Sequence, residues 1–186
     1  MVISVAVVVG SLRRESFSRK VAKAAMARSP SGMTCELVEI SDIPMFNEDL
    51  EVRPPAEWET FRSVIRRSDG VLFVTPEYNR SVPGCLKNAI DVGSRPEGEN
   101  VWDGKPAGVI SVTPYKLGAF GANHALRQTF VFLNMPVMQQ PEAYIGGAGN
   151  LFDEKGTLTD DETGAFLKKF MDAFSQWTGR LRSRGG

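Results

Sequence analysis

Residues 71–91 read VLFVTPEYNRSVPGCLKNAID, and this stretch decides the fold. Its first five residues form an unbroken β-prone run, which is typical of a central parallel strand covered on both faces. The polar residues that follow lie between Pro76 and Pro83, which restrict the backbone at both ends of a loop, and Pro83 suits the first turn of a helix. A loop between a buried strand and a helix lies at the carboxyl edge of a parallel sheet, where α/β proteins bind ligands.

The N-terminus has the same order of features. Residues 2–9, VISVAVVV, predict a buried strand, and residues 10–18, GSLRRESFS, form a polar loop before a helical pattern. Hydroxyls, guanidinium groups and the N–H groups at a helix start all favour an anion. Only Gly10 is present where a dinucleotide fingerprint has three glycines, and no Gly-Lys-Ser/Thr ending is present for a triphosphate. The loop therefore favours a terminal monophosphate.

Strands and helices alternate along the rest of the chain. Five strand–helix units predict an α/β doubly wound, three-layer sandwich. No repeat, linker or second domain is evident, so residues 1–186 are expected to form a single domain. The expected strands are 2–9, 34–40, 71–75, 107–113 and 136–139, and the expected helices are 17–28, 56–68, 84–93, 120–133 and 160–182.

The last helix has its own signals. Thr159 and Glu162 fit a capping box at its start. Large apolar residues then recur at helical spacing, which indicates a core-facing stripe and not a cofactor site. The stripe consists of Phe166, Phe170, Phe174, Trp177 and Leu181, beside Leu167 and Met171.

Composition narrows the function classes. Lys plus Arg and Asp plus Glu both number 22, a balance that gives no sign of a nucleic-acid or membrane partner. No apolar run approaches the ~20 residues of a membrane span, so a soluble, cytoplasmic protein is expected. With one histidine and two cysteines, no metal site is expected, and Cys85 is interpreted as a small buried apolar residue.

The two loops together resemble the NADPH-dependent FMN reductase family, in particular its chromate and quinone reductase branch, within the flavodoxin-like fold. The resemblance spans nearly the whole chain and implies a five-stranded parallel sheet of order 2-1-3-4-5, whose switch point lies between the first and third strands. The segments that match the family pattern are GSLR at 10–13, SFS at 16–18, PEYN at 76–79, SVPG at 81–84 and LKNAID at 86–91, with GKP at 104–106, LRQ at 126–128 and PE at 141–142.

The resemblance implies a bound FMN and an NADPH or NADH electron donor. Because the chemistry occurs at N5 of the flavin, no catalytic side chain is expected. Thr113, at the end of the fourth strand, is expected to reach the flavin edge. The phosphate is expected to contact Ser11, Arg13, Ser16, Phe17 and Ser18, and the isoalloxazine ring to contact Pro76, Glu77, Tyr78 and Asn79.

Two residues are candidates for contacts with the substrate or NADPH. Residues 111–118, SVTPYKLG, depart from the small Ser/Gly-rich turn of the family, and the bulk of Tyr115 leaves the pocket shape and substrate range open. Arg80 follows the second loop directly. It is a candidate contact for the 2′-phosphate of NADPH or for an anionic acceptor, with a solvated arginine that has no partner as the alternative.

The implied activity is hydride transfer from NAD(P)H through FMN to quinones or other small acceptors, with chromate included by resemblance. An azo or nitro reductase on the same scaffold stays open. A flavodoxin-type carrier fits less well, because such carriers resemble each other in a Thr-rich phosphate loop and usually have an acidic surface. Another alternative is a flavodoxin-like module that is not an enzyme, binds partners and holds no cofactor. Such a protein would be colourless.

The assembly is expected to be a homodimer or homotetramer, with no partner beyond small molecules and other subunits. The resemblance places Arg95 and Glu142 between subunits. Residues 41–55 and 94–104 form two long segments, each of which is either ordered by a ligand or a second subunit or an ordinary surface loop.

Overall fold

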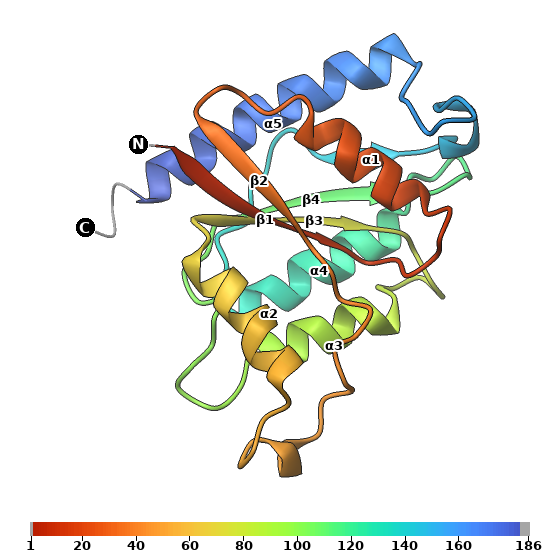
Figure 1. The fold of residues 1–186 in the computed structure, drawn as a ribbon. Helices are drawn as coiled ribbons and strands as arrows, with labels where there is room; N and C mark the ends of the chain where they lie inside the picture. Colours follow the sequence, from red (N-terminus) through yellow and green to blue (C-terminus); the bar gives the residue numbers. More distant parts are fainter. Residues whose placement is uncertain (1, 183–186) are drawn as a thin grey trace.

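A computed structural model describes residues 2–182 and has a five-stranded parallel sheet in the order β2-β1-β3-β4-β5, with helices on both faces (Figure 1). This arrangement confirms the α/β flavodoxin-like prediction. The strands are β1 Ile3–Val9, β2 Met33–Val38, β3 Gly70–Thr75, β4 Ala107–Val112 and β5 Ala143–Ile145. The helices are α1 Phe17–Met26, α2 Ala56–Arg67, α3 Gly84–Gly93, α4 Phe120–Phe132 and α5 Asp161–Arg182, with short 3-10 helices at Glu48–Leu50 and Ala148–Asn150.

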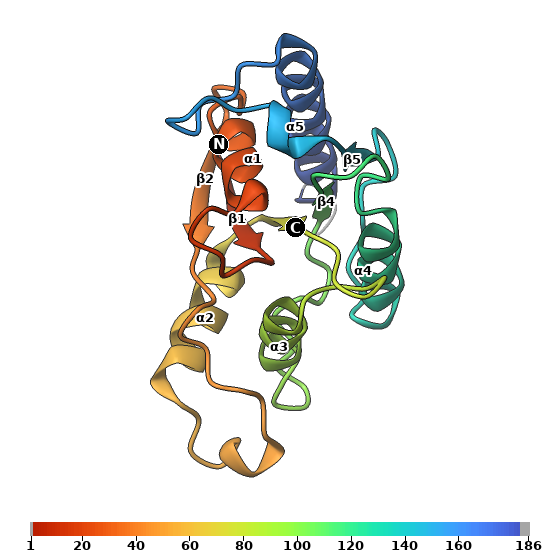
Figure 2. The same ribbon diagram turned by 90° about the vertical axis from the view of Figure 1, so that its right-hand side faces the viewer.

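The central strands are apolar along their length because helices cover both of their faces. Every residue of β3 and β4 is buried, as are the last five residues of β1. Helices α1 and α5 lie on one face of the sheet, and α2, α3 and α4 lie on the other (Figures 1 and 2). The single-domain organisation stays a prediction, and residues 1 and 183–186 of that expected range lie outside the described residues.

The core beneath α2, α3 and α4 is centred on aromatic rings. The Phe73 ring of β3 lies 4.7 Å from that of Phe130 and 5.7 Å from that of Trp102, measured between ring centroids. Trp102 is fully buried, and its indole N–H donates to the carbonyl of Ile90 at 2.9 Å. Segment 94–104 is therefore anchored in the core by one of its own side chains.

Contacts within the chain also hold segment 41–55. The buried side chain of Asn88, on α3, accepts from the N–H of Phe46 at 2.7 Å and donates to the carbonyls of Ile43 and Pro44 at 3.2 and 3.1 Å. The indole N–H of Trp58 donates to Pro44 at 2.9 Å. These bonds satisfy polar groups of a segment that has little regular structure, which favours the interpretation as an ordinary surface loop held by its own chain.

The predicted fifth strand, 136–139, is wrong in position. Pro136 and Met138 exchange backbone hydrogen bonds with Ala107, at the start of β4, through an isolated bridge. The strand itself is β5, which pairs with the end of β4. The segment 136–138 and β5 therefore both lie along β4, one at its start and the other at its end. The sequence pattern alone does not show which of the two forms the strand.

The predicted capping box at Thr159 is also wrong. The carboxylate of Asp160 accepts from the N–H of Thr163 at 2.7 Å. Hydrogen bonding to the Thr163 side chain, and then to its backbone N–H, lowers the pKa of Asp160. The hydroxyl of Thr159 donates instead to the carbonyl of Leu151 at 3.3 Å. On α5 the core stripe is confirmed at Phe170 and Phe174, whereas its expected members Phe166, Trp177 and Leu181 are only partly buried.

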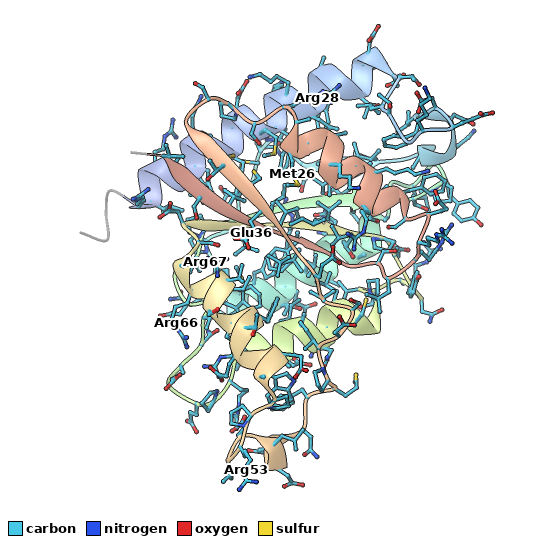
Figure 3. All side chains as sticks on the ribbon, viewed as in Figure 1. Met26, Arg28, Glu36, Arg53, Arg66 and Arg67 are labelled. Atoms are coloured by element: carbon cyan, nitrogen blue, oxygen red, sulfur yellow. The ribbon has the colours of Figure 1, made fainter. Side chains whose placement is uncertain are left out.

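Surface ion pairs link α2 to its surroundings. Arg67 lies 2.7 Å from a carboxylate oxygen of Glu36 on β2, and both are labelled in Figure 3. Such exposed pairs contribute about 0–1 kcal/mol each, so the cores dominate stability. Within residues 2–182, no helix is long and apolar enough to cross a membrane.

Replacing Asn88 with Ala should lower the free energy of unfolding by about 2–3 kcal/mol, because it leaves buried backbone groups of segment 41–55 without partners. Urea denaturation followed by tryptophan fluorescence measures the change. Lys87→Ala is the control, since it removes an exposed ion pair to Asp91 from the same helix and should cost about 0.5 kcal/mol or less. Equal losses in the two variants would contradict the role of Asn88.

Candidate functional site

The loops after β1 and β3 lie side by side because these strands are neighbours in the sheet. The N–H of Gly10 donates to Val74 at 2.9 Å, which extends the pairing to the start of both loops. A cavity of about 240 Å³ opens between them and the end of β4. It is lined by Ser11, Arg13, Ser16, Phe17, Ser18, Pro76, Glu77, Tyr78, Val112, Thr113, Pro114 and Tyr115.

The structure thus brings together all the expected cofactor residues except Asn79. Val112 and Pro114 also line this cavity, and the sequence pattern did not single them out as contacts. Gly10 stands where its neighbours leave no room for a side chain, since a Cβ atom there would lie 2.9 Å from both Leu86 Cδ2 and Thr75 Oγ1. Glycine therefore lets the first loop leave β1 directly over α3.

The first loop forms the positively polarised end of the cavity. Ser11, Ser16 and Ser18 are buried, and the hydroxyl of Ser16 accepts from the N–H of Arg19 at 3.2 Å, which caps α1. The first turn of α1 contains no acidic residue. Its N–H groups and the guanidinium of Arg13 therefore favour an anion at this end.

The second loop contains a two-residue hairpin. Tyr78 and Ser81 exchange two backbone hydrogen bonds of 3.0 Å, and Asn79 and Arg80 between them have φ angles of 52° and 65°. Two consecutive left-handed residues characterise the tight hairpin turn that usually contains Asn-Gly. The hairpin leaves Pro76, Glu77 and Tyr78 in the first cavity and carries Asn79 out of it. The sequence NR gave no signal for this turn.

The Glu77 side chain connects the hairpin to α4. One carboxylate oxygen accepts from the N–H of Ala122 at 3.2 Å, and the other lies 3.5 Å from a guanidinium nitrogen of Arg80. A Cβ atom on Gly121 would lie 2.9 Å from the Arg80 carbonyl oxygen and 3.0 Å from Glu77 Oε2. The glycine therefore permits close packing of the loop against the helix start, where the dipole favours a carboxylate.

A second cavity of about 380 Å³ adjoins the first and shares Glu77, Thr113 and Tyr115 with it. Arg80 and Tyr115, the two substrate candidates, both line it, and both side chains are largely exposed. Leu117 adds an exposed apolar wall. The remaining lining residues are Asn79 and Ala119.

Two side chains that could take part in chemistry, Cys85 and His124, lie outside both cavities. Burial raises the pKa of the Cys85 thiol, which keeps it protonated near neutral pH. The imidazole of His124 is 2.9 Å from the hydroxyl of Tyr144 on the outer side of α4. Within residues 2–182, no group of His, Cys, Asp and Glu residues is placed to hold a metal ion.

A hollow of about 400 Å³ between β2 and α2 lies away from both loops. Its lining includes Glu36 and Glu39, whose carboxylates are paired with Arg67 and Arg19 at 2.7 and 2.6 Å. These ion pairs neutralise two of the carboxylates that line the hollow, and the family-like loops do not reach it, so the switch-point cavities remain the best candidates for chemistry.

Known proteins are similar to this chain in sequence and in structure. The chain matches the NADPH-dependent FMN reductase family over residues 3–150. A quinone reductase of Pseudomonas putida is 62% identical over 177 residues, 95% of each chain, and an NAD(P)H-dependent FMN reductase of Pseudomonas aeruginosa is 43% identical over 175 residues, 93% of this chain and 94% of that one. The structure is similar to FerB, a flavoenzyme NAD(P)H:(acceptor) oxidoreductase from Paracoccus denitrificans, with a TM-score of 0.91 and 40% identity over 97% of this chain and 99% of that one.

These matches confirm the resemblance inferred from the two loops, including its quinone reductase branch. None of the names just given mentions chromate, so that part of the expectation stays a prediction. The family match includes both loops and the end of β4, which together line the first cavity. The chain belongs to the NADPH-dependent FMN reductase family.

Proposed function

We propose that this protein is an FMN-dependent NAD(P)H oxidoreductase that reduces quinones. The observation that carries the proposal is the cavity at the switch point. It is lined by three buried serines of the first loop and the start of α1 and by residues 76–78 of the second loop, which is expected to contact a flat flavin ring. The quinone reductase that is 62% identical supports the choice of acceptor. When bound, FMN would supply the hydride-transfer chemistry between NAD(P)H and the acceptor.

The donor set of the first loop fits the phosphate of FMN. Hydroxyls of Ser11, Ser16 and Ser18, the guanidinium of Arg13 and the N-terminus of α1 supply hydrogen-bond donors and positive charge within one small cavity. The Phe17 ring lies 5.9 Å from the Arg13 guanidinium carbon, which helps to orient that side chain over the cavity.

The second loop and the end of β4 fit the ring. Pro76 and the paired backbone of Tyr78 hold the loop in one conformation, so its amide groups can bind the polar ring edge without reordering. Thr113 faces the same cavity, and its own N–H is bound to Ile145 at 2.9 Å. We propose that Glu77 contributes to this side through its backbone, because its carboxylate is bound to α4, whereas Asn79 lines the adjoining cavity.

An absorbance spectrum of the purified protein tests the function. Bound FMN gives visible absorption bands, and we expect them to bleach when NADPH or NADH is added without oxygen and to return when a quinone is added. Bands that ignore both nicotinamides would indicate an electron carrier fed by another protein. The absence of bands after incubation with FMN would contradict the proposal entirely.

Replacing Arg13 with Ala should weaken FMN binding roughly 10- to 100-fold, because one charge-assisted hydrogen bond is lost. Binding of riboflavin, which has the same ring and no phosphate, should change little. Fluorescence titration of both flavins measures this difference. Arg14→Ala is the control, since Arg14 lies in the same loop without lining the cavity. Equal weakening for FMN and riboflavin would place Arg13 away from the phosphate.

We further propose a cytoplasmic, single-domain protein that forms a homodimer or homotetramer. The outer side of α4 supports self-association, because it exposes Phe120, Val131 and Phe132, with Val131 and Phe132 exposed to 82% and 91%. An apolar surface of this kind is typical of subunit interfaces. Arg95, expected between subunits, lies 2.7 Å from Glu51 and 2.9 Å from Glu48 of its own chain, so α4 carries this proposal.

Light scattering at several protein concentrations should give the mass of a dimer or tetramer, and Phe132→Lys should shift it toward the monomer, because a buried lysine disfavours the interface. Val52→Lys is a matched control, since Val52 is an equally exposed apolar residue on segment 41–55. A wild-type protein that is monomeric throughout would contradict the proposed assembly.

A further inference from the structure

The second cavity differs from the first in charge and in its walls. Its rim includes the guanidinium of Arg80, whose side chain is 79% exposed, and its walls include Tyr115 and Leu117. The carboxylate of Glu77, 3.5 Å away, neutralises this charge only in part, because it also binds the N–H of Ala122. The cavity therefore combines apolar surface with an accessible cation.

The hairpin fixes the backbone from which Arg80 extends. Its neighbours Tyr78 and Ser81 are paired on both sides of the turn, and its carbonyl packs against Gly121 at the start of α4. A φ of 65° is in the left-handed region, which strains an arginine backbone, and the surrounding bonds maintain it. The charge is thus held beside the cavity by a rigid base, while its flexible side chain can adjust to a ligand.

The position of Arg80 favours an anion close to the reacting rings. Arg80 follows Tyr78 by two residues, and Tyr78 lines the first cavity, where we place the flavin ring. In NADPH the 2′-phosphate is on the adenosine, separated from the nicotinamide by the pyrophosphate and a second ribose. A charge on the acceptor ring itself would lie much closer to Arg80.

We propose that the second cavity binds the acceptor and that Arg80 selects quinones with an ionised oxygen substituent, such as hydroxyquinones, over neutral quinones of the same size. This inference rests on the proposed function. The overall reaction is unchanged: NAD(P)H supplies two electrons and a proton as hydride, solvent supplies a second proton, and the quinone becomes a hydroquinone. Tyr115 and Leu117 pack against the ring, and Arg80 binds the ionised oxygen through a charge-assisted hydrogen bond.

Two naphthoquinones of similar shape test the selectivity. 2-Hydroxy-1,4-naphthoquinone is ionised at neutral pH, and 2-methoxy-1,4-naphthoquinone is neutral. The ratio of their kcat/KM values is compared between wild type and Arg80→Ala, so that differences in intrinsic reactivity cancel. We expect the variant to lose roughly tenfold in preference for the anion, mainly through KM for the hydroxyquinone.

Three further measurements complete the design. Arg80→Lys keeps the charge and should retain part of the preference. Arg53→Ala, which removes an exposed arginine from segment 41–55 at the far end of the molecule, should retain all of it (Figure 3). FMN affinity of Arg80→Ala should match that of wild type, because alanine meets the same backbone restriction as arginine at this turn.

The outcomes separate this inference from the proposed function. An unchanged quinone ratio in Arg80→Ala, with both quinones still reduced, overturns the selectivity and leaves the reductase standing. If the variant raises KM for NADPH more than KM for NADH, relative to wild type, and the quinone ratio is unchanged, Arg80 contacts the electron donor. That outcome also overturns the selectivity. A wild-type protein that reduces neither quinone overturns the proposed function itself.

Discussion

The parallel pairing of β1 with both β2 and β3 is the constraint on which the rest of the structure depends. Because β1 lies between β2 and β3, the chain crosses to opposite faces of the sheet after its first and third strands, which leaves a crevice between the loops that follow them. Buried valines along β1 leave no alternative register without exposing apolar surface. A polar cavity at this position is thus a product of topology, and the loop residues decide what it can bind.

Close packing at two glycines converts this topology into a defined site. Gly10 lets the first loop pass over α3, and Gly121 lets the hairpin pack against α4. The carboxylate of Glu77 then binds the start of α4, so the loop is held from three directions: by β3, by its own turn and by a helix. A preorganised backbone of this kind spares a ligand the cost of ordering the loop.

Much of this was predictable from the sequence. The strand runs and the two polar loops predicted the α/β class from local pattern, and the family resemblance that the loops support implied the sheet order and most of the cavity lining. Three features were not. The fifth strand was misplaced since Val137 and Tyr144 lie along the same neighbouring strand, and the Asp160 cap competed with an equally plausible Thr159. The left-handed turn at Asn79 and Arg80 depends on tertiary contacts that no local signal records.

Neighbouring residues of the hairpin have different roles. Its two paired positions, Tyr78 and Ser81, fix the backbone that faces the first cavity, whereas the two positions at its tip face the second. A substitution at the tip therefore leaves the backbone bonds beneath it intact. Acceptor preference can then diverge among descendants of one ancestral protein through exchanges at residues 79 and 80, without selection having to rebuild the cofactor site.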